Sequence, residues 1–391
     1  MKNCMKNLTK LIGLTALVAV IGFAFIACDD GNKNPNDNGN GNGDGNGNGN
    51  GNGTNDNATV YVAGYAVTGN RRACYWKDGV RTILPSEESA VATGIAVLGD
   101  SIYVIGVLGD NFDKACYWKN GVLTFLPIPE ETSSSFVAGI TVSDGSVYIL
   151  GNYYYYGDGG RRVCYWKDGV RTDIPDVNSP EAFSIAVSGG SVYLTGYYIS
   201  VTDTTVTDVP CYWKDGVRTD LPPSTMASAI TVSGGSVYIA GLDDYDYAWG
   251  GGRACYWKDG VITYLSEPEG LTGCAIDSIA VSGGSVYVTG YYNGGRYAMP
   301  FYWKDGVRIN LPLIDPWRSA PLYDPSRSKA TKIALLGNSV YILGIYVLPN
   351  SHPLFGLEQS CYWKDGKITN LPLVRDTLDY YFVYDIAVVP K

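Results

Sequence analysis

Cys164-Tyr165-Trp166-Lys167-Asp168-Gly169-Val170-Arg171-Thr172 is the stretch that decides the fold, because close copies of it recur along the chain. Tyr-Trp-Lys occurs seven times after residue 58; six copies continue into Asp-Gly and the second into Asn120-Gly121. Successive tryptophans lie 42 to 60 residues apart, a period typical of propellers and other repeat proteins. We expect the seven tryptophans to form the repeated core: Trp76, Trp118, Trp166, Trp213, Trp257, Trp303 and Trp363.

Each repeat contains four strand-like pieces: one like Ile185-Ala186-Val187, one like Ser285 to Gly290, the Cys-Tyr-Trp-Lys piece and a Val-Arg-Thr-x-Leu piece. Alternating apolar residues, β-branched residues and glycine-rich breaks indicate strands. Four antiparallel strands in each of seven units predict an all-β, seven-bladed β-propeller over residues 58–391. An open stack of sheets is disfavoured, because its terminal repeats would need polar caps and the sequence has none.

The last two pieces of each repeat predict a hairpin, for which two registers are open. A two-residue Asp-Gly turn places Trp76 opposite Arg81. A three-residue loop with a bulge at Gly79 places Trp76 opposite Val80 and gathers Cys74, Trp76 and Val80 on one face. We favour the bulged loop, because a slip of one residue would move side chains between the faces.

The two ends of the repeat region predict ring closure. The first unit begins at Val60-Tyr61 without an Ile-x-Val piece before it, and a spare piece appears at the C-terminus as Ile386-Ala387-Val388. We therefore expect residues 384–389 to pair with residues 59–63. This pairing would complete the first blade and remove an open sheet edge.

The N-terminus has the pattern of an export signal, with Lys2, Lys6 and Lys10 before an apolar stretch of 17 residues that ends at Ala27. A membrane-spanning helix is the alternative, although about 20 apolar residues are usual for one. Phe25-Ile26-Ala27-Cys28 resembles a lipobox, in which Cys28 becomes the lipidated first residue. Residues 1–27 are then a lipoprotein signal peptide, with an ordinary secretory signal as the remaining possibility.

Residues 28–57 are almost entirely glycine, asparagine and aspartate after Cys28. Such a segment has few side chains to bury and predicts a disordered linker. A calcium-binding glycine repeat is disfavoured, because the aspartates follow no period. The formal charge is −9 and the first 27 residues hold three lysines and no acids. The processed chain is therefore more acidic still, which argues against a nucleic-acid partner.

The Trp-Lys-Asp-Gly-Val-x-Thr-x-Leu stretch is similar to the bacterial extracellular repeats called HAF, and the strand order resembles that of kelch-type propellers. The whole chain resembles uncharacterised repeat lipoproteins such as those of spirochaetes. Kelch repeats carry a double glycine after the second strand, whereas here Gly196 is followed by Tyr197-Tyr198. The resemblance implies a propeller fold far more than a particular function.

The loops between the second and third strands vary from 10 to 17 residues, while the hairpin turns are short and uniform. Variation on one face of a fixed scaffold is typical of a binding face. Tyrosine is unusually frequent, with 32 residues, and many tyrosines lie in these loops. The candidate binding face is Tyr154, Tyr155, Tyr156, Tyr198, Tyr245, Tyr247, Trp249, Tyr292 and Tyr297. The alternative is that tyrosines directly after the glycine extend the second strand and pack between blades.

The sequence favours no cofactor and no metal. His352 is the only histidine, which weakens imidazole chemistry and zinc sites. Asp243, Asp244 and Asp246 could bind calcium through oxygen ligands, although solvated acids are the default. The repeat cysteines are expected to be small buried residues, with Cys255 and Cys274 as the pair to check for a disulfide.

These patterns predict a lipid-anchored envelope protein that binds a protein or carbohydrate ligand without catalysis. It would lie at the outer membrane or cell surface, or at the periplasmic face of the inner membrane. A propeller-type carbohydrate-active enzyme, hydrolase or lyase, is the alternative, and two carboxyls facing each other across the centre would favour it. A structural scaffold in a periplasmic assembly is the third possibility.

Overall fold

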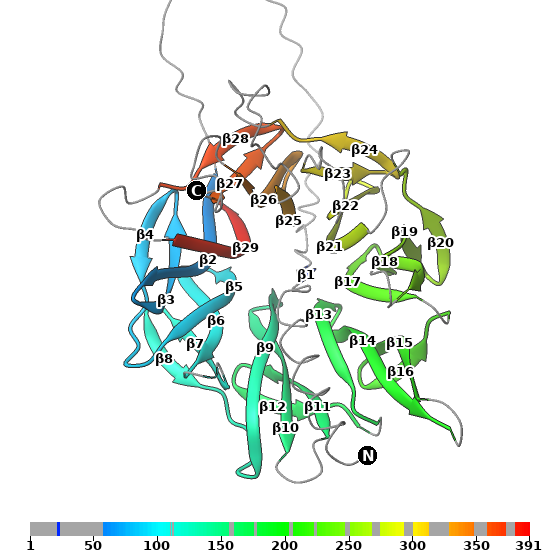
Figure 1. The fold of residues 1–391 in the computed structure, drawn as a ribbon, viewed down its shortest axis with the longest axis horizontal. Helices are drawn as coiled ribbons and strands as arrows, with labels where there is room; N and C mark the ends of the chain where they lie inside the picture. The colour runs from blue at the N-terminus through cyan, green and yellow to red at the C-terminus, as the bar shows by residue number, and fades with distance from the viewer. Residues whose placement is uncertain are drawn as a thin grey trace, which may run out of the picture.

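Seven antiparallel sheets are arranged as blades in a ring (Figure 1). The computed structural model describes residues 22–23, 58–109, 111, 113–155, 160–175, 178–202, 206–222, 225–246, 251–267, 274–292, 300–312, 328–347, 358–372 and 380–391. In each blade the strand closest to the axis carries the Ile-x-Val piece, or Ile333-Ala334-Leu335 in blade 7, and the piece equivalent to Val170-Arg171-Thr172 forms the outermost strand. The predicted seven-bladed, all-β architecture is confirmed.

The strands, from the inside to the outside of each blade, have the following bounds. Blade 1 is β29 (Tyr380–Pro390), β2 (Ala58–Thr68), β3 (Asn70–Lys77) and β4 (Val80–Ile83); blade 2 is β5 (Ala90–Leu98), β6 (Ser101–Leu108), β7 (Lys114–Lys119) and β8 (Val122–Phe125). Blade 3 is β9 (Thr132–Ser143), β10 (Ser146–Tyr155), β11 (Arg161–Lys167) and β12 (Val170–Asp173); blade 4 is β13 (Glu181–Ser188), β14 (Ser191–Val201), β15 (Val206–Lys214) and β16 (Val217–Asp220). Blade 5 is β17 (Met226–Ser233), β18 (Ser236–Asp246), β19 (Gly251–Lys258) and β20 (Val261–Tyr264); blade 6 is β21 (Cys274–Ser282), β22 (Ser285–Tyr292), β23 (Phe301–Lys304) and β24 (Val307–Asn310). Blade 7 is β25 (Lys329–Leu336), β26 (Ser339–Val347), β27 (Glu358–Lys364) and β28 (Lys367–Asn370).

One further strand, β1 (Gly22–Phe23), lies inside the ring (Figure 1). It pairs in parallel with β13, Gly22 opposite Ser184 and Phe23 opposite Ile185. Because β14 occupies the other edge of β13, β1 lies at the axial edge and makes the sheet of blade 4 five-stranded. The inner strands β9, β17, β21 and β25 also contact it.

Ring closure is confirmed, because the C-terminal strand β29 completes blade 1. Thr59 pairs with Val389, and Val62 pairs with Ile386, in an antiparallel ladder that extends over β2. β29 also contacts β5 of blade 2 and β25 of blade 7. The two ends of the domain are therefore joined by main-chain hydrogen bonds, as the count of strand pieces predicts.

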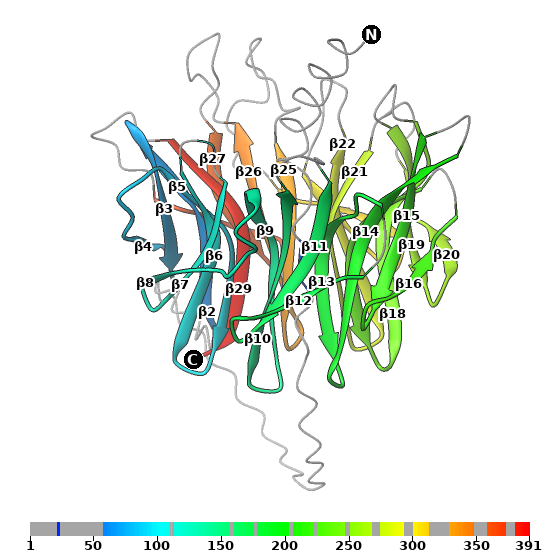
Figure 2. The ribbon, with the colours of Figure 1, turned by 90° about the horizontal axis from the view of Figure 1, so that it is seen from below.

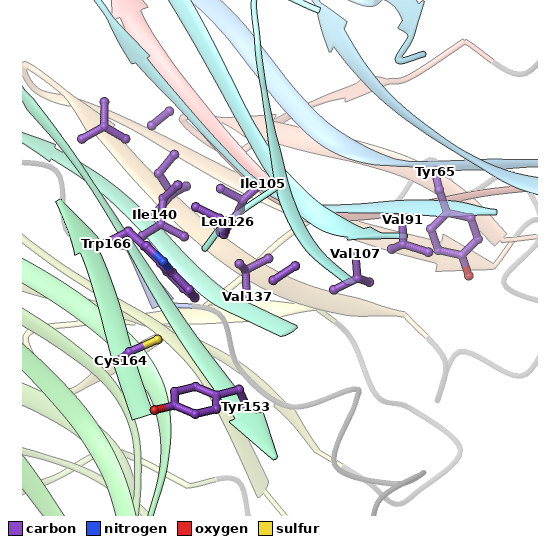
Figure 3. Packing of buried hydrophobic residues seen from close by; sticks show 14 residues of the cluster. Tyr65, Val91, Ile105, Val107, Leu126, Val137, Ile140, Tyr153, Cys164 and Trp166 are labelled. Carbon is purple, nitrogen blue, oxygen red and sulfur yellow. The ribbon is translucent and has the colours of Figure 1, made fainter. Parts of the chain in front are cut away.

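The seven tryptophans expected in the repeated core are each 0 or 1% exposed. Each packs between two blades: Trp166 of blade 3 lies with Ile140 of its own blade and with Ile105 and Leu126 of blade 2 (Figure 3). In four blades the indole Nε1 donates to a carbonyl that follows the preceding blade's outer strand; the pairs are Trp118–Pro85, Trp166–Pro127, Trp303–Ser266 and Trp363–Pro312. The repeated Leu-Pro therefore supplies a buried leucine and an acceptor for the next blade's tryptophan.

The favoured hairpin register is wrong. Trp76 lies opposite Arg81 and Lys77 opposite Val80, which is the two-residue Asp-Gly turn. Asp78 has φ +48° and Gly79 has φ +81°, as a type I′ turn requires. The outer strand is an exposed edge and not half of a buried face, since Val80 is 70% exposed. The assumption that both hairpin strands share a buried face caused the error.

The aspartate of each turn also binds the second strand of its own blade. Asp168 Oδ1 accepts from the Val147 N–H at 2.9 Å, while the Asp168 N–H donates to the Val147 carbonyl at 2.9 Å. All seven blades make this pair of contacts, including blade 2, where Asn120 takes the place of aspartate. An Asp or Asn here tolerates the left-handed backbone and also accepts this hydrogen bond, which explains the Asp-Gly repeat.

The ring has two unlike faces (Figure 2). The turn face carries the short hairpins, such as Gly189-Gly190 between β13 and β14, and the Asp-Gly turns. The loop face carries the connections between second and third strands and between blades. β2 begins at the turn face, where Val60 contacts the Asp78 turn and Ala58 pairs with Pro390.

Candidate functional site

Three of the nine aromatic side chains of the predicted binding face are described, and all three belong to strand ends near the loop face. Tyr154 and Tyr155 end β10, and Tyr198 lies in β14; each is half-buried. Tyr156, Tyr247, Trp249 and Tyr297 lie outside the described residues, as do the side chains of Tyr245 and Tyr292. Each of the described tyrosines extends the second strand of its blade, and their role as a binding face stays a prediction.

Two of these tyrosines lie against arginine side chains, Tyr198 against Arg218 and Tyr155 against Arg162. The Arg218 guanidinium lies 4.0 Å from the centre of the Tyr198 ring, and its Nε lies 2.7 Å from Asp220 Oδ1. The Tyr198 hydroxyl donates to Asp220 Oδ2 at 3.3 Å. In blade 3 the Arg162 guanidinium lies 5.6 Å from the Tyr155 ring. The Tyr198 group therefore presents a flat ring, a guanidinium and a carboxylate together.

Arginine–tyrosine contacts recur in other blades, two of them with buried rings. Arg81 lies over Tyr381 at 4.9 Å and Arg71 over Tyr65 at 5.5 Å. In blade 5 Arg253 lies 3.8 Å from the ring of Tyr264, which is 41% exposed. Stacked arginine and tyrosine are enriched where proteins bind other molecules, because both offer contact area and directional hydrogen bonds.

One buried carboxylate belongs to a closed structural cluster between blades 3 and 4. Glu181 is 6% exposed and forms an ion pair with Arg161. The Tyr197 hydroxyl donates to Glu181 Oε2 at 2.7 Å and accepts from Arg161 Nη1 at 2.6 Å. Burial raises the pKa of Tyr197. Because every partner is satisfied within the trio, this cluster clamps the blades and is not free to act on a ligand.

The residue before the isoleucine of each inner strand forms a second set, and its side chain is polar in four of the seven blades. In blade order these residues are Asp385, Gly94, Gly139, Ser184, Ala229, Ser278 and Lys332. Asp385 Oδ2 accepts from the Ile95 N–H of blade 2 at 2.8 Å, and Ser184 Oγ accepts from the Ile230 N–H of blade 5 at 3.2 Å. Since β6 pairs with the other edge of β5, Asp385 reaches the axial edge of that strand.

Seven buried polar side-chain atoms on the inner strands have no hydrogen-bond partner. One belongs to Thr132, the first residue of β9, and we call the other six residues the axial polar belt. They are Thr93, Ser228, Asp277, Ser278, Lys332 and Asp385. The three charged members belong to consecutive blades, with Asp277 on β21, Lys332 on β25 and Asp385 on β29. Their exposed fractions are 8%, 4% and 0%. An unpaired buried polar group costs about 1–3 kcal/mol, and more when it is charged.

Burial shifts the protonation of all three charged groups toward neutrality. Desolvation raises the pKa of Asp277 to about 7 and that of Asp385 to about 8, while the nearby Lys332 ammonium opposes both shifts. Desolvation lowers the pKa of Lys332 to about 8, against the attraction of Asp385 and Asp277. The two carboxyls lie on blades 6 and 1 with Lys332 on blade 7 between them. They are therefore neighbours along the inner wall and do not form the facing pair named as the sign of a glycosidase.

The remaining sequence predictions concern metal ligands, a disulfide and a membrane-spanning helix. Among the described residues no group of three or more metal-ligating side chains occurs. Asp243 accepts from the Tyr264 hydroxyl at 2.7 Å, and the side chain of Asp246 lies outside the described residues. Cys255 and Cys274 are both buried, and they do not form a disulfide with each other. In the described part of the chain, no helix is long and apolar enough to span a membrane.

Sequence reasoning missed the axial polar belt, although a signal for part of it is present. When the seven inner-strand pieces are aligned on their isoleucine, the preceding residue is glycine, alanine or serine in five blades. Lys332 and Asp385 are the exceptions. The signal in the sequence is therefore a charged residue at a repeat position that otherwise carries only small side chains.

The comparisons with known proteins support the fold. No family model and no curated protein sequence matches the chain. Among solved structures, the acylaminoacyl peptidase of Pyrococcus horikoshii is 13% identical with a TM-score of 0.50, covering 81% of this chain and 51% of the peptidase. The β-propeller domain of the trilobed protease of Pyrococcus furiosus is 11% identical with a TM-score of 0.50, covering 83% of this chain and 95% of that domain.

These likenesses show the fold alone. This chain spans about half the length of the acylaminoacyl peptidase, so the activity of that enzyme does not transfer. The trilobed protease propeller is described as having an open velcro topology, whereas here β29 pairs with β2 and closes the ring.

Proposed function

We propose that this protein is a lipid-anchored envelope lipoprotein whose propeller binds a protein or carbohydrate ligand through its loop face without catalysis. The observation that carries the proposal is the set of arginine–tyrosine groups near that face, for example Arg218 stacked on Tyr198 at 4.0 Å. The likeness of its repeats to kelch and HAF repeats, and of the chain to spirochaete-type lipoproteins, belongs to the same proposal.

The position of the first propeller strand indicates the side from which a linker would join this binding module. A linker formed by residues 28–57 would join the propeller at Ala58, the first residue of β2, which lies at the turn face beside Pro390. A lipid on Cys28 would then attach the propeller from its turn-face side through a flexible linker, which leaves the loop face accessible. The membrane would be the outer membrane, on either side, or the periplasmic face of the inner membrane.

Site-specific photo-crosslinking tests the proposal. A photoreactive residue in place of Tyr198 reports on the loop face, and one in place of Val217, which is 71% exposed, reports on the turn face. In intact cells we expect a discrete crosslinked partner, protein or glycan, from position 198 and only lipid adducts or no adduct from position 217. A discrete partner from position 217 alone would contradict the proposed binding face.

A further inference from the structure

Blades 3, 4 and 5 each bring a tyrosine, an arginine and an aspartate together where the outer strand ends at the loop face. In blade 4 these are Tyr198, Arg218 and Asp220, whose contacts are described above, and the Asp220 side chain is 45% exposed. The sets of blades 3 and 5 have the same composition, and we call all three sets the outer trios. Their other members are Tyr153, Arg171 and Asp173 in blade 3, and Tyr264, Arg253 and Asp243 in blade 5.

The trio of blade 3 has the same contacts as that of blade 4. The Tyr153 hydroxyl donates to Asp173 Oδ1 at 3.1 Å, and Arg171 Nε lies 3.2 Å from the same oxygen. The Tyr153 ring is buried, and the half-buried Tyr155 ring packs edge-on against it at 5.6 Å. The Asp173 side chain is 46% exposed. This trio is therefore open to solvent, unlike the buried cluster around Glu181.

Blade 5 builds its trio from different strand positions. On the outer strand, the residue opposite the repeat cysteine is Asp220 in blade 4 but Tyr264 in blade 5. On the second strand, the residue two places after the glycine is Tyr198 in blade 4 but Asp243 in blade 5. The tyrosine and the aspartate have exchanged strands, yet the Tyr264 hydroxyl still donates to Asp243, at 2.7 Å.

Fastening the outer strand does not require the arginine. In blade 7 the Tyr346 hydroxyl donates to Asn370 at 3.2 Å, and Ile368 takes the position that Arg218 has in blade 4. Blade 5 also has an isoleucine, Ile262, at that position, but there Arg253 of the third strand lies 3.8 Å from the Tyr264 ring. Strand packing alone therefore gives no reason for the arginine in blade 5, whereas a ligand that needs all three groups does.

We infer that the outer trios of blades 3, 4 and 5 bind a neutral polysaccharide that extends across adjacent blades. This inference rests on the proposed binding role of the loop face and names its ligand class. Each trio offers guanidinium N–H donors, carboxylate acceptors and an amphipathic ring. These groups match the hydroxyls of a sugar and its apolar C–H groups.

Charge and repetition favour this class of ligand over others. Arginine and aspartate cancel within each trio, so a charged polymer meets no net local charge, and the formal charge of −9 repels a polyanion. A stable protein interface usually has an apolar core, whereas the exposed groups of the trios are polar or amphipathic. A polysaccharide repeats its own unit, so one chain can present the same hydroxyls to three similar sites.

Calorimetric titration of the processed, lipidated protein in detergent tests the inference. The probes are malto-, cello- and N-acetylated chito-oligosaccharides of two and six units, with oligogalacturonates of the same lengths as anionic controls. We expect at least one neutral series to bind, and its six-unit member to bind about tenfold or more tightly than its two-unit member, because the longer chain contacts more than one trio. Binding of no neutral probe, equal affinity for both lengths, or preference for oligogalacturonate would overturn the inference.

Two variants place the ligand on the trios. Arg218→Met removes the guanidinium of blade 4 and should weaken binding of the six-unit chain by about tenfold or more; Arg253→Met in blade 5 replaces it if that variant fails to fold. Lys214→Met is the matched control, because it also removes a cation that lies over a tyrosine of blade 4, 5.4 Å from the Tyr193 ring, but at the turn face. The control should keep the affinity within about twofold. Unchanged affinity in a folded arginine variant would overturn the inference.

The proposed loop-face function can stand without this inference. A discrete protein crosslink from position 198, together with no binding of any neutral oligosaccharide, would overturn the polysaccharide ligand and leave the loop-face function in place. A partner captured from position 217 alone would instead contradict the loop-face function itself.

Discussion

Truncating Ile386 to alanine should destabilise the whole propeller, because this side chain lies in the strand that closes the ring. Ile386 is 1% exposed and packs with Val62 and Trp76 of blade 1 and with Ala334 and Leu343 of blade 7. Removing a well-packed isoleucine beyond its Cβ costs about 2–5 kcal/mol, from lost transfer free energy and the cavity left behind.

The structure supplies a matched control. Ile185 occupies the equivalent position of blade 4, is 0% exposed, and lies in the middle of the chain. If packing of β29 stabilises the ring as much as packing of the other inner strands does, Ile386→Ala and Ile185→Ala should lower the free energy of unfolding by similar amounts. Phe382→Ala, at a residue that is 38% exposed, should cost much less.

Deleting residues 380–391 removes the entire closing strand. Its four large buried apolar side chains are Tyr381, Val383, Ile386 and Val388. At about 1.5–3 kcal/mol for each, their loss amounts to roughly 6–12 kcal/mol, comparable with the whole stability of a typical domain. We expect the truncated chain to lose its cooperative transition and to aggregate through the exposed edge of β2.

Urea unfolding followed by tryptophan fluorescence measures these effects, with circular dichroism as a second probe. The reasoning would be refuted if Ile386→Ala cost less than about 1 kcal/mol while Ile185→Ala cost the expected amount. It would equally be refuted if the truncated chain kept the wild-type transition.

Four other changes have defined outcomes. Cys28→Ser should abolish metabolic lipid labelling and release the protein from membranes; a labelled, membrane-bound variant would exclude the lipobox. Trp166→Ala should lower the free energy of unfolding by about 3–5 kcal/mol, and a loss below about 1 kcal/mol would mean that the blade interface repacks around the cavity. Asp168→Ala should cost about 1–3 kcal/mol through the lost acceptor for Val147, whereas Asp168→Asn should be tolerated because Asn120 fills the same position in blade 2; equal effects would argue against the turn contact. The raised pKa of Asp385, about 8 against 3.8, means that the folded chain binds a proton more tightly, so the stability of the full-length chain should fall as pH rises from about 4 to 8. Asp385→Asn should reduce that slope, measured by urea unfolding across the pH range, and an unchanged slope would contradict the burial of this carboxyl.

Much of the architecture follows from the sequence, because the repeat carries it. Seven Tyr-Trp-Lys copies indicate the number of blades, and the spare Ile-Ala-Val piece at residues 386–388 indicates that the ring closes through its ends. These predictions succeed because each depends on counting similar units, and a strand that is missing at one end must be supplied from the other. The seven buried tryptophans follow from the same repetition.

The hairpin register depended on information that the repeat does not contain. Val80 looks like a core residue by type, yet it lies on the outermost strand and is 70% exposed. Which strand is at the edge is a property of the assembled ring. The left-handed pair Asp78-Gly79 then selects the tight turn, since both backbone positions have positive φ.

Only the tertiary structure brings the residues of the axial polar belt together. Asp277, Lys332 and Asp385 lie more than 50 residues apart in sequence, and nothing local to each residue indicates that the three will meet. The ring brings the residues just before the isoleucine of every inner strand to the same axis, so residues separated by whole blades become neighbours. Sequence determines the repeated blade, because its strands and turns are set by nearby residues. Ring closure determines which residues lie around the axis, because only the closed ring places inner strands from different blades around one space. Closure also buries the charged groups on those strands away from water.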